Sequence, residues 1–259
     1  MKKKQIDQML DDHFKKLGIK KNDNILVHAN LSSFGILENR KLPENIIKRL
    51  IKHVGKKGSI VMPLYNFGLN SNKVFDEKKI YVKGMSVLYI KFFKNFSKYK
   101  SKSLMHRHIG LGKDAKCLLK TKSTNSLGYK SDFYYLLSKN FNLLLLGCKA
   151  SEGATYLHHL EAIVEVPYRK WIKIKVKTKK NKKFNYQYLN YYSRKNNIYK
   201  ENFDNFFDKI NKKLIKSANL RFGSSKLISL KNLHKEGIKA FKKNKYCLVK
   251  KNEFFNKKN

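Results

Sequence analysis

Acidic residues, cysteines and long apolar runs are all scarce in this sequence. Asp and Glu number 18 in 259 residues, against 59 Lys and Arg, so the formal net charge is +41. Three cysteines are too few for a disulfide scaffold, and their spacing fits no zinc motif. The most apolar run, residues 143–146, is far shorter than a membrane span, and no apolar segment follows the basic start of the chain. We therefore expect a soluble protein of the reducing cytoplasm, without a metal site or a membrane-spanning segment.

The excess of positive charge has two interpretations. A nucleic-acid-binding protein uses such charge against phosphates. A biased composition gives the same total, because Lys, Asn, Ile, Phe and Tyr are all abundant and the lysines are spread along the whole chain. Arginine, which is preferred for bidentate phosphate and base contacts, is scarce. We expect weak, salt-sensitive binding of any polyanion and no specific nucleic-acid partner.

The apolar pattern predicts one α/β domain over residues 1–259. Hydrophobic residues make up 41% of the chain, enough for a sizeable core, and no linker or repeat divides it. Buried strands are predicted at 24–28, 59–62 and 142–146, a half-exposed strand at 171–177, and helices at 6–17, 43–54, 203–216 and 229–243. The stretch 178–200 shows no clear period. The order of elements predicts a three-layer α/β fold with a mainly parallel central sheet and additional C-terminal strands and helices.

Three polar segments follow the predicted buried strands. They are 28–35 (HANLSSFG), 63–67 (PLYNF) and 147–161 (GCKASEGATYLHHLE). Ligands of open parallel sheets bind at the carboxyl ends of the strands. The sequence therefore predicts a site where these three segments meet.

The third segment has the residues for acid–base chemistry. On a helix over 155–164, His158 and Glu161 lie three residues apart on one face, and Thr155 lies one turn earlier. A carboxylate beside an imidazole fixes its tautomer and raises its basicity, as a general base requires. Alternatively, the two side chains only hydrogen-bond each other on a surface helix. His159 points elsewhere and is expected to be structural, and the spacing lacks the HExxH pattern of a zinc site.

Two weaker candidates lie beside these residues. Ser32, Ser33 and Gly35 stand between a strand and a helix, where backbone N–H groups can hold an anion or a thioester carbonyl. The loop is neither a Walker A nor a GxGxxG motif, and an ordinary turn explains it equally. Cys148 follows the strand 142–146 and is a possible nucleophile beside His158, although an inert buried cysteine is favoured.

Four blocks of the sequence, in this order, resemble one enzyme family. They are LGIKKNDNILVHANLSSFGIL (17–37), IIKRLIKHVGKKGSIVMPLYNF (46–67), NLLLLGCKASEGATYLHHLEAIVEVPYRK (142–170) and NLRFGSSKLISLKNLHKEGIKAFKKN (219–244). The family is that of the aminoglycoside 3-N-acetyltransferases, which use acetyl-CoA and differ in fold from the GNAT enzymes. In the combination of blocks the resemblance is specific, and it runs from about residue 8 to about residue 248.

The resemblance implies metal-free transfer of an acetyl group from acetyl-CoA to a primary amine of an amino sugar or aminoglycoside, as in antibiotic resistance. By position it implies that His158 is the general base, with Glu161 as its partner and Thr155 beside the thioester. The residues that it implies for the cosubstrate are His28, Ser32, Ser33, Phe34, Gly35 and His106. The protein is expected to be a monomer or a homodimer. A basic nucleic-acid-binding module and a catalytically inactive relative are the alternative functions.

Two features set this chain apart from the family pattern. In KYKSKSLMHRHIGLGKDA (98–115), a proline is missing and Arg107 stands where a small serine is expected, so we expect altered contacts to the acceptor or to CoA. A protein of charge +41 also repels a polycation, although salt screens this beyond about 8 Å. The carboxylates expected near the site are few: Asp76, Glu152, Glu161 and Glu165. We therefore expect a neutral or anionic amino sugar as the natural acceptor.

Overall fold

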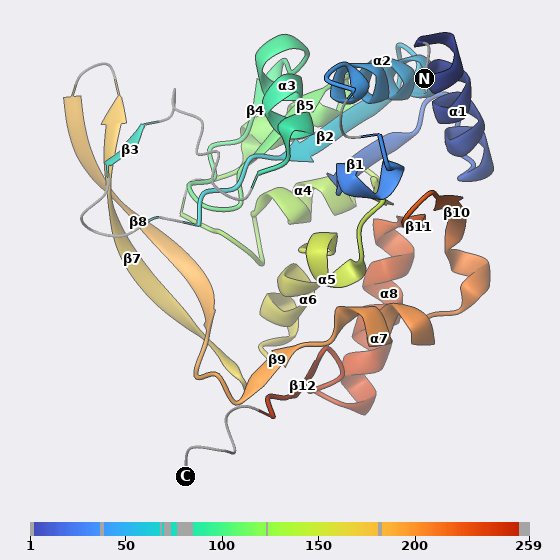
Figure 1. Cartoon of the computed structure of the whole chain (residues 1–259). Coiled ribbons are helices and arrows are strands. Elements are labelled where there is room, and N and C mark those ends of the chain that lie inside the picture. The colour runs from blue at the N-terminus through green and yellow to red at the C-terminus, as the bar shows by residue number, and fades with distance from the viewer. Residues whose placement is uncertain are drawn as a thin grey trace.

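A computed structural model describes residues 3–36, 39–67, 69, 74–76, 85–122, 124–180 and 183–253. The strands of its main sheet are β1 (Asn24–Ala29), β2 (Ser59–Pro63), β4 (Tyr99–Lys100), β5 (His108–Leu111), β6 (Asn142–Leu146), β10 (Lys216–Leu220) and β11 (Gly223–Ser229). They lie in the order β10-β11-β6-β1-β2-β5-β4. The three predicted buried strands are therefore neighbours at the centre of the sheet (Figure 1).

The centre of this sheet is parallel and its flanks are antiparallel. β1 pairs in parallel with β6 on one side and with β2 on the other. β11 and β5 then run antiparallel to β6 and β2. The predicted α/β class and parallel core are confirmed, and the carboxyl ends of β1, β2 and β6 meet at one edge of the sheet.

Helices cover both faces of the sheet and give three layers (Figure 1). The helices are α1 (Lys3–Lys16), α2 (Leu42–Val54), α3 (Val87–Asn95), α4 (Asp132–Ser138), α5 (Ala150–Gly153), α6 (Tyr156–Val164), α7 (Phe203–Lys209) and α8 (Leu230–Lys243). Three short 3-10 turns are η1 (Leu31–Phe34), η2 (Asp114–Lys120) and η3 (Lys212–Leu214). Apolar residues of α1, α2 and α3 pack on one face, and those of α4, α6, α7 and α8 pack on the other.

The alternation of side chains along β6 explains why both faces are apolar. Leu143 and Leu145 belong to the cluster under α6 and α8, whereas Leu144 and Leu146 belong to the cluster under α1 and α2. A strand between two helical layers buries both faces, so it is apolar throughout. Each such leucine contributes about 1.5–3 kcal/mol relative to an exposed one.

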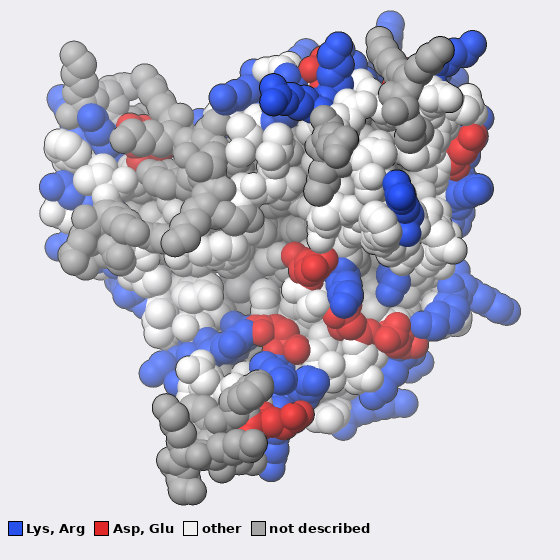
Figure 2. Space-filling model, in the orientation of Figure 1, with Lys and Arg blue, Asp and Glu red and all other residues white. Residues whose placement is uncertain are grey.

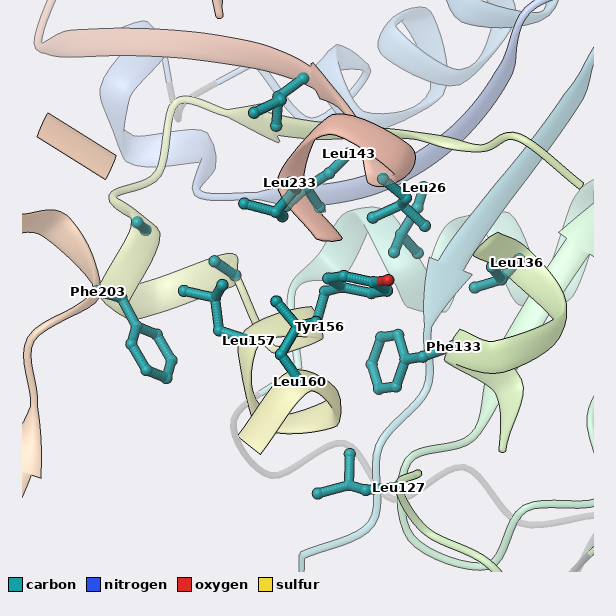
Figure 3. Close-up of a cluster of buried hydrophobic side chains, with 14 of the residues drawn as sticks. Leu26, Leu127, Phe133, Leu136, Leu143, Tyr156, Leu157, Leu160, Phe203 and Leu233 are labelled. Atoms are coloured by element: carbon teal, nitrogen blue, oxygen red, sulfur yellow. The ribbon is translucent and has the colours of Figure 1, made fainter. Parts of the chain in front are cut away.

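One cluster of buried side chains places the helix that carries the predicted site. Tyr156 of α6 is fully buried between β6, α4 and α8 (Figure 3). Its ring meets the edge of Phe133 at 5.9 Å, and its hydroxyl is hydrogen-bonded to His234 Nδ1 at 2.9 Å. Because this large side chain has no freedom, the start of α6 is held firmly against the sheet.

The remaining strands form a ribbon beside the main sheet. β7 (Arg169–Lys180) pairs antiparallel with β8 (Lys183–Arg194), and β3 (Val74–Asp76) pairs in parallel with β7. β9 (Tyr199–Glu201) pairs with β12 (Val249–Lys251). The predicted strand 171–177 is confirmed and is longer than expected. The stretch 178–200, for which we predicted no element, contains β8.

The helix predicted over 203–216 is shorter in the structure. α7 ends at Lys209, and Ile210 is extended, with φ −66° and ψ 143°. The side chain of Asn211 then accepts a hydrogen bond from the Lys213 amide and begins η3. An asparagine at this place favours a new cap over a continued helix.

Candidate functional site

His158 and Glu161 lie together on α6, close to the carboxyl edge of the sheet. The Nδ1 atom of His158 is 2.7 Å from the Oε2 atom of Glu161. The imidazole is partly exposed, while the carboxylate is completely buried. Phe203 packs its ring against the imidazole with the centroids 4.9 Å apart. The predicted pairing of these two side chains is present, with the carboxylate behind the imidazole.

Two hydrogen bonds and one ion pair hold the Glu161 carboxylate in place. The Tyr168 hydroxyl donates to Oε1 at 2.8 Å, and the Nε atom of Arg169 forms an ion pair with Oε2 at 2.8 Å. The second hydrogen bond comes from Nδ1 of His158. Burial, followed by the nearby Glu161 charge, raises the pKa of Tyr168 well above its usual value, so the phenol keeps its proton as a donor.

This arrangement leaves one nitrogen of His158 available. Since Nδ1–H donates to Glu161, the proton-accepting nitrogen is Nε2. Nε2 has no hydrogen-bond partner among the residues that the structure describes. Arg169 Nη2 also lies 3.0 Å from Nδ1, and it is 3.2 Å from Glu201 Oε1. The site thus presents a tautomer-fixed imidazole that can take a proton at Nε2.

Thr155 lies directly before α6 and contacts the segment after β2. Its side chain lies near the hydroxyl of Tyr65, which follows Pro63 at the end of β2, and this interaction acts to lower the pKa of Tyr65. Tyr65 is buried, and burial raises its pKa well above the usual value. The phenol in turn lies 3.2 Å from the Nε2 atom of His108. Thr155 therefore lies near polar groups below the surface.

His28 and His106 both lie around the ring of Tyr65. Their ring centroids are 6.1 and 5.2 Å from that of Tyr65. Burial, and then neighbouring imidazoles, lowers the pKa of each histidine to about 3. Nδ1 of His106 is hydrogen-bonded to Ser126, and Nε2 of His28 is buried without a partner. The structure brings these two predicted cosubstrate residues together around Tyr65 as neutral imidazoles.

The other predicted cosubstrate residues form the turn after β1. The Ser32 hydroxyl donates to Asn30 Oδ1 at 2.6 Å, and the Ser33 hydroxyl donates to the Gly147 carbonyl. The Phe34 side chain is buried beside His13, so only its backbone is available to a ligand. Gly35 has φ +67°, which an L-residue adopts at a cost.

A cavity of about 370 Å³ lies beside this turn, between the ends of β1 and β6. Its lining residues are Ala29, Asn30, Leu31, Met85, Ser86, Tyr89, Cys148 and Glu152. The turn that holds Ser32 therefore forms one wall of a cavity at the predicted edge of the sheet.

Cys148 lies in this wall but is unsuited to act as a nucleophile. The residue is 7% exposed, and its Sγ donates to the His28 carbonyl at 3.5 Å. Burial raises the pKa of the thiol to about 12. A protonated thiol at neutral pH favours the inert alternative that we preferred for this cysteine.

The carboxylates around His158 are paired with arginines. Glu161 faces Arg169, and Glu201 contacts both Arg169 and Arg194. Burial is the largest single influence on the pKa of Glu201 and raises it, but the hydrogen bond from Arg194, a backbone hydrogen bond and the nearby positive charges together lower this pKa. Figure 2 shows one face of the molecule, with Lys and Arg around its outline and in its middle, and with Asp and Glu in a few groups near basic residues.

The predicted carboxylates are spread over several elements. Glu152 lines the cavity, Glu165 ends α6, and Asp76 lies on β3. Of these four carboxylates, Glu161 alone has a hydrogen bond to His158 among the residues that the structure describes. His159, expected to be structural, is buried, and burial lowers its pKa to about 3.

Sequence reasoning missed several residues of this site. Tyr168 and Arg169 belong to the VPYRK segment at the end of the third block, which was matched as a motif without a role for either residue. Tyr65 and Glu201 come from other segments. No helical or strand spacing connects these residues to His158, so only the tertiary structure brings them together.

Two features are absent from the residues that the structure describes. Within these ranges, no group of three or more His, Cys, Asp and Glu side chains is arranged to hold a metal ion. No helix in the described part of the chain has the length and apolarity to cross a membrane.

Comparison with known proteins gives a family and a fold. The sequence profile described as aminoglycoside 3-N-acetyltransferase matches residues 26–242. No curated protein matches the chain. Among solved structures, the YokD protein from Bacillus subtilis is similar, with 22% identity over 92% of this chain and 93% of that one, at a TM-score of 0.76.

Two further solved structures are similar over nearly their whole length. AAC-IIIb, solved as a binary complex with CoASH, has 18% identity over 92% of this chain and 96% of its own, at a TM-score of 0.76. The aminoglycoside acetyltransferase AAC(3)-IVa, solved in complex with a gentamicin, has 18% identity over 93% and 90%, at a TM-score of 0.74. At these identities the likeness establishes the fold.

Proposed function

The chain belongs to the aminoglycoside 3-N-acetyltransferase family, and on this premise we propose that it transfers the acetyl group of acetyl-CoA directly to a primary amine of an amino sugar or aminoglycoside. The chain is thus an acyltransferase by family. The contact of 2.7 Å between His158 and the buried Glu161 carries the mechanistic part of the proposal.

His158 is the general base in this proposal. A sugar amine is mostly protonated at neutral pH, and only the free amine attacks a thioester. Nε2 of His158 takes a proton from the amine while the nitrogen of the amine forms its bond to the acetyl carbon. Glu161 keeps the other ring nitrogen protonated and stabilises the imidazolium, which then returns a proton to the departing sulfur. A positioned base of this kind contributes about 10²–10⁴-fold to a rate.

In this proposal, Thr155 and the turn after β1 bind the thioester part of acetyl-CoA. Acetyl-CoA supplies the activated acetyl group and leaves as a thiol. We assign the cavity beside Asn30 and Cys148 to its pantetheine arm, because the cavity lies at the carboxyl edge of the parallel strands, where ligands of such sheets bind. His28 and His106 lie beside Tyr65 as neutral imidazoles, so neither of them adds a charge there at neutral pH. The AAC-IIIb complex with CoASH supports the same cosubstrate.

The charges around His158 favour a neutral or anionic acceptor. A polycationic aminoglycoside is best held by unpaired carboxylates. Here Glu161 and Glu201 are both paired with arginines, and the chain carries a net charge of +41. We therefore propose an amino sugar of low positive charge as the natural acceptor, within the activity that the family supports.

A thiol-release assay tests this function. The native chain is mixed with acetyl-CoA and a panel of neutral amino sugars, nucleotide-linked amino sugars and aminoglycosides, and the acetylated product is identified by mass. Release of CoA with at least one amine, and acetylation of its nitrogen, is the expected result. No release with any amine contradicts the proposal.

The same panel tests the acceptor class. We expect a higher kcat/KM for a neutral or nucleotide-linked amino sugar than for a kanamycin-type amine at equal ionic strength. A strong preference for the polycation contradicts this part of the proposal and leaves the acetyl transfer itself intact.

A further inference from the structure

One face of the β7–β8 ribbon is apolar and covered. Ile174 and Val176 of β7 and Leu189 of β8 pack with Leu104 and Met105 in a small hydrophobic cluster. Val176 and Leu189 are completely buried. Successive side chains of a strand point to opposite faces, so the residues between these ones form the other face of the ribbon. The ribbon is thus held to the molecule by its inner face and presents its outer face to solvent.

The outer face of the ribbon combines lysines with aromatic rings. Every second residue of β7 from 173 to 179 is a lysine, and the register places these lysines opposite Asn190, Tyr188, Tyr186 and Phe184 of β8. The three aromatic residues are 47, 57 and 53% exposed, in the same order. Single exposed apolar residues are ordinary, whereas a contiguous patch of them marks a surface used for interaction. The outer face is therefore a candidate docking surface.

The charge of this face is almost entirely positive. Asp76 of β3, opposite Lys179 in the register, is the only acidic residue in the strands β3, β7 and β8. The lysine ammonium groups also lie over the rings. The distances from Nζ to the ring centre are 4.3, 4.5 and 4.8 Å for the pairs Lys173–Tyr188, Lys175–Tyr186 and Lys177–Phe184. Positive charge and aromatic surface therefore occur side by side along the whole face.

An anionic lipid surface complements both components of this face. Its headgroups attract lysines, and aromatic rings are favoured at the boundary between headgroups and acyl chains. A strand on which lysines lie beside rings brings both groups to that boundary together. A second copy of the chain does not fit in the same way, because two such faces carry charge of the same sign and repel each other.

A single-stranded nucleic acid fits the face less well than a lipid surface. Proteins that hold single strands stack bases on the faces of aromatic rings. Here ammonium groups lie over the rings of Tyr186 and Tyr188, on faces that stacked bases would occupy. No arginine lies between Arg169 and Arg194, although arginine is the preferred residue for bidentate phosphate contacts. A lipid surface needs neither a free ring face nor a bidentate contact.

We propose that the outer face of the β7–β8 ribbon is a docking surface for an anionic lipid bilayer. The lysines of β7 lie against the headgroup phosphates, and the rings of Phe184, Tyr186 and Tyr188 enter the boundary with the acyl chains. The contact is peripheral, with the ribbon lying on the bilayer. It does not depend on the proposed acetyl transfer, so either proposal can fail without the other.

Co-sedimentation of the full chain with vesicles is the first test. We expect binding to vesicles of phosphatidylcholine and phosphatidylglycerol in equal parts, and binding at least about 10-fold weaker to phosphatidylcholine alone, since each lysine near an anionic surface strengthens binding about 5-fold. Two variants replace four lysines each by serine: 173, 175, 177 and 179 on β7, or 231, 235, 239 and 242 on α8, which lies away from the ribbon (Figure 1). The β7 variant is expected to lose at least about 10-fold more affinity for the anionic vesicles than the α8 variant. Equal losses, or no preference for anionic vesicles in the native chain, overturn the proposal.

The aromatic residues distinguish a bilayer from other polyanions. A triple variant carries Phe184→Thr, Tyr186→Thr and Tyr188→Thr, because threonine keeps the preference for a strand. We expect its binding to anionic vesicles to fall at least about 10-fold and its binding to heparin to change less than about 2-fold, since heparin has no apolar layer. Phe184→Thr alone is compared with Phe222→Thr, which removes another exposed phenylalanine, between β10 and β11. Only Phe184→Thr is expected to weaken vesicle binding. Native vesicle binding in the triple variant, or an equal loss of vesicle and single-stranded RNA binding, overturns the proposal.

A fluorescence measurement shows which face of the native chain meets the vesicle. Trp171 is the only tryptophan of the chain, it is 41% exposed, and it lies two residues before Lys173 on the same face. With anionic vesicles whose acyl chains carry bromine, we expect its emission to shift to shorter wavelength and to be quenched. With heparin we expect neither change. Vesicle binding with unchanged emission of Trp171 shows docking by another face and overturns the proposal.

Discussion

Nε of Arg169 lies 2.8 Å from Oε2 of Glu161, at a point where both side chains are almost completely buried. The carboxylate that holds His158 is therefore also the partner of a buried guanidinium. Breaking a buried pair leaves an uncompensated charge, which costs far more than losing an exposed pair. Glu161 thus supports both the proposed chemistry and the local fold.

Glu161→Ala is expected to destabilise the protein. It removes the fully buried carboxylate that faces Arg169 and leaves this guanidinium only its contact with Glu201, so we expect the free energy of unfolding to fall by about 3–5 kcal/mol. Glu44→Ala is the control, because Glu44 pairs with Lys48 and Lys91 on the surface, where ion pairs contribute little to stability. Denaturant unfolding of both variants measures the difference. Equal losses contradict a structural role for Glu161.

Cys148→Ser is expected to keep the acetyl transfer. Burial raises the pKa of this thiol to about 12, so little thiolate exists at neutral pH. We expect kcat within a few-fold of the native value, and slow reaction of the native thiol with an alkylating reagent. A folded Cys148→Ser chain without turnover, together with a trapped acetyl-cysteine, favours the alternative of a covalent intermediate.

Stability is expected to fall in mild acid. Burial lowers the pKa of His13 to about 4 and those of His28, His106 and His159 to about 3. Between about pH 6.5 and these values, the unfolded chain binds protons that the folded chain does not, so unfolding becomes easier as pH falls. Each imidazole removes up to about 1.4 kcal/mol per pH unit in this range.

Thermal unfolding at pH 7.5, 6.5, 5.5 and 4.5 measures this effect. The Tm is expected to change little above pH 6.5 and to drop progressively below it. In His13→Gln the drop is expected to be shallower than in the native chain. A Tm that stays constant from pH 7.5 to 4.5 is inconsistent with neutral buried imidazoles.

Polyanion binding is expected to depend on charge alone. On β7, Lys173 lies 4.3 Å from the ring centre of Tyr188 and Lys175 lies 4.5 Å from that of Tyr186, so ammonium groups line one face of the ribbon. We expect heparin and RNA to bind with similar affinity that falls steeply with salt. Replacing the β7 lysines 173, 175, 177 and 179 by serine is expected to reduce the salt slope for both ligands.

The control for this experiment changes the same number of charges elsewhere. Lysines 231, 235, 239 and 242 lie on α8 and are replaced by serine in the same way. If binding follows net charge, the two variants lose affinity for heparin and RNA in parallel. A preference for particular RNA sequences that persists at high salt instead supports the nucleic-acid-binding alternative.

The apolar pattern of the sequence predicted the central fold because each helix buries one apolar stripe and each strand buries one apolar run. The strands at 24–28, 59–62 and 142–146 lie between two helical layers and are apolar throughout. β8 was missed for the opposite reason. Its exposed face bears Phe184, Tyr186 and Tyr188, so apolar and aromatic side chains occur on both faces and hide the period of two. Only its pairing with β7 defines it as a strand.

The site was predictable only where its geometry is local. His158 and Glu161 are three residues apart, and a helix alone brings them into contact. Arg169, Tyr65 and Glu201 reach the site from β7, from the loop after β2 and from β9. Such long-range contacts leave no spacing signal in one sequence. The residues that support the proposed base could therefore be identified only from the fold.

The most direct test is the turnover of His158→Ala with an acceptor that the native chain acetylates. His53→Gln, which alters a histidine on α2 paired with Asp11, is the control. We predict that kcat/KM falls at least about 100-fold in His158→Ala, while its Tm stays near that of the native chain and the control remains active. Native kcat/KM in folded His158→Ala contradicts the assignment of this imidazole as the base.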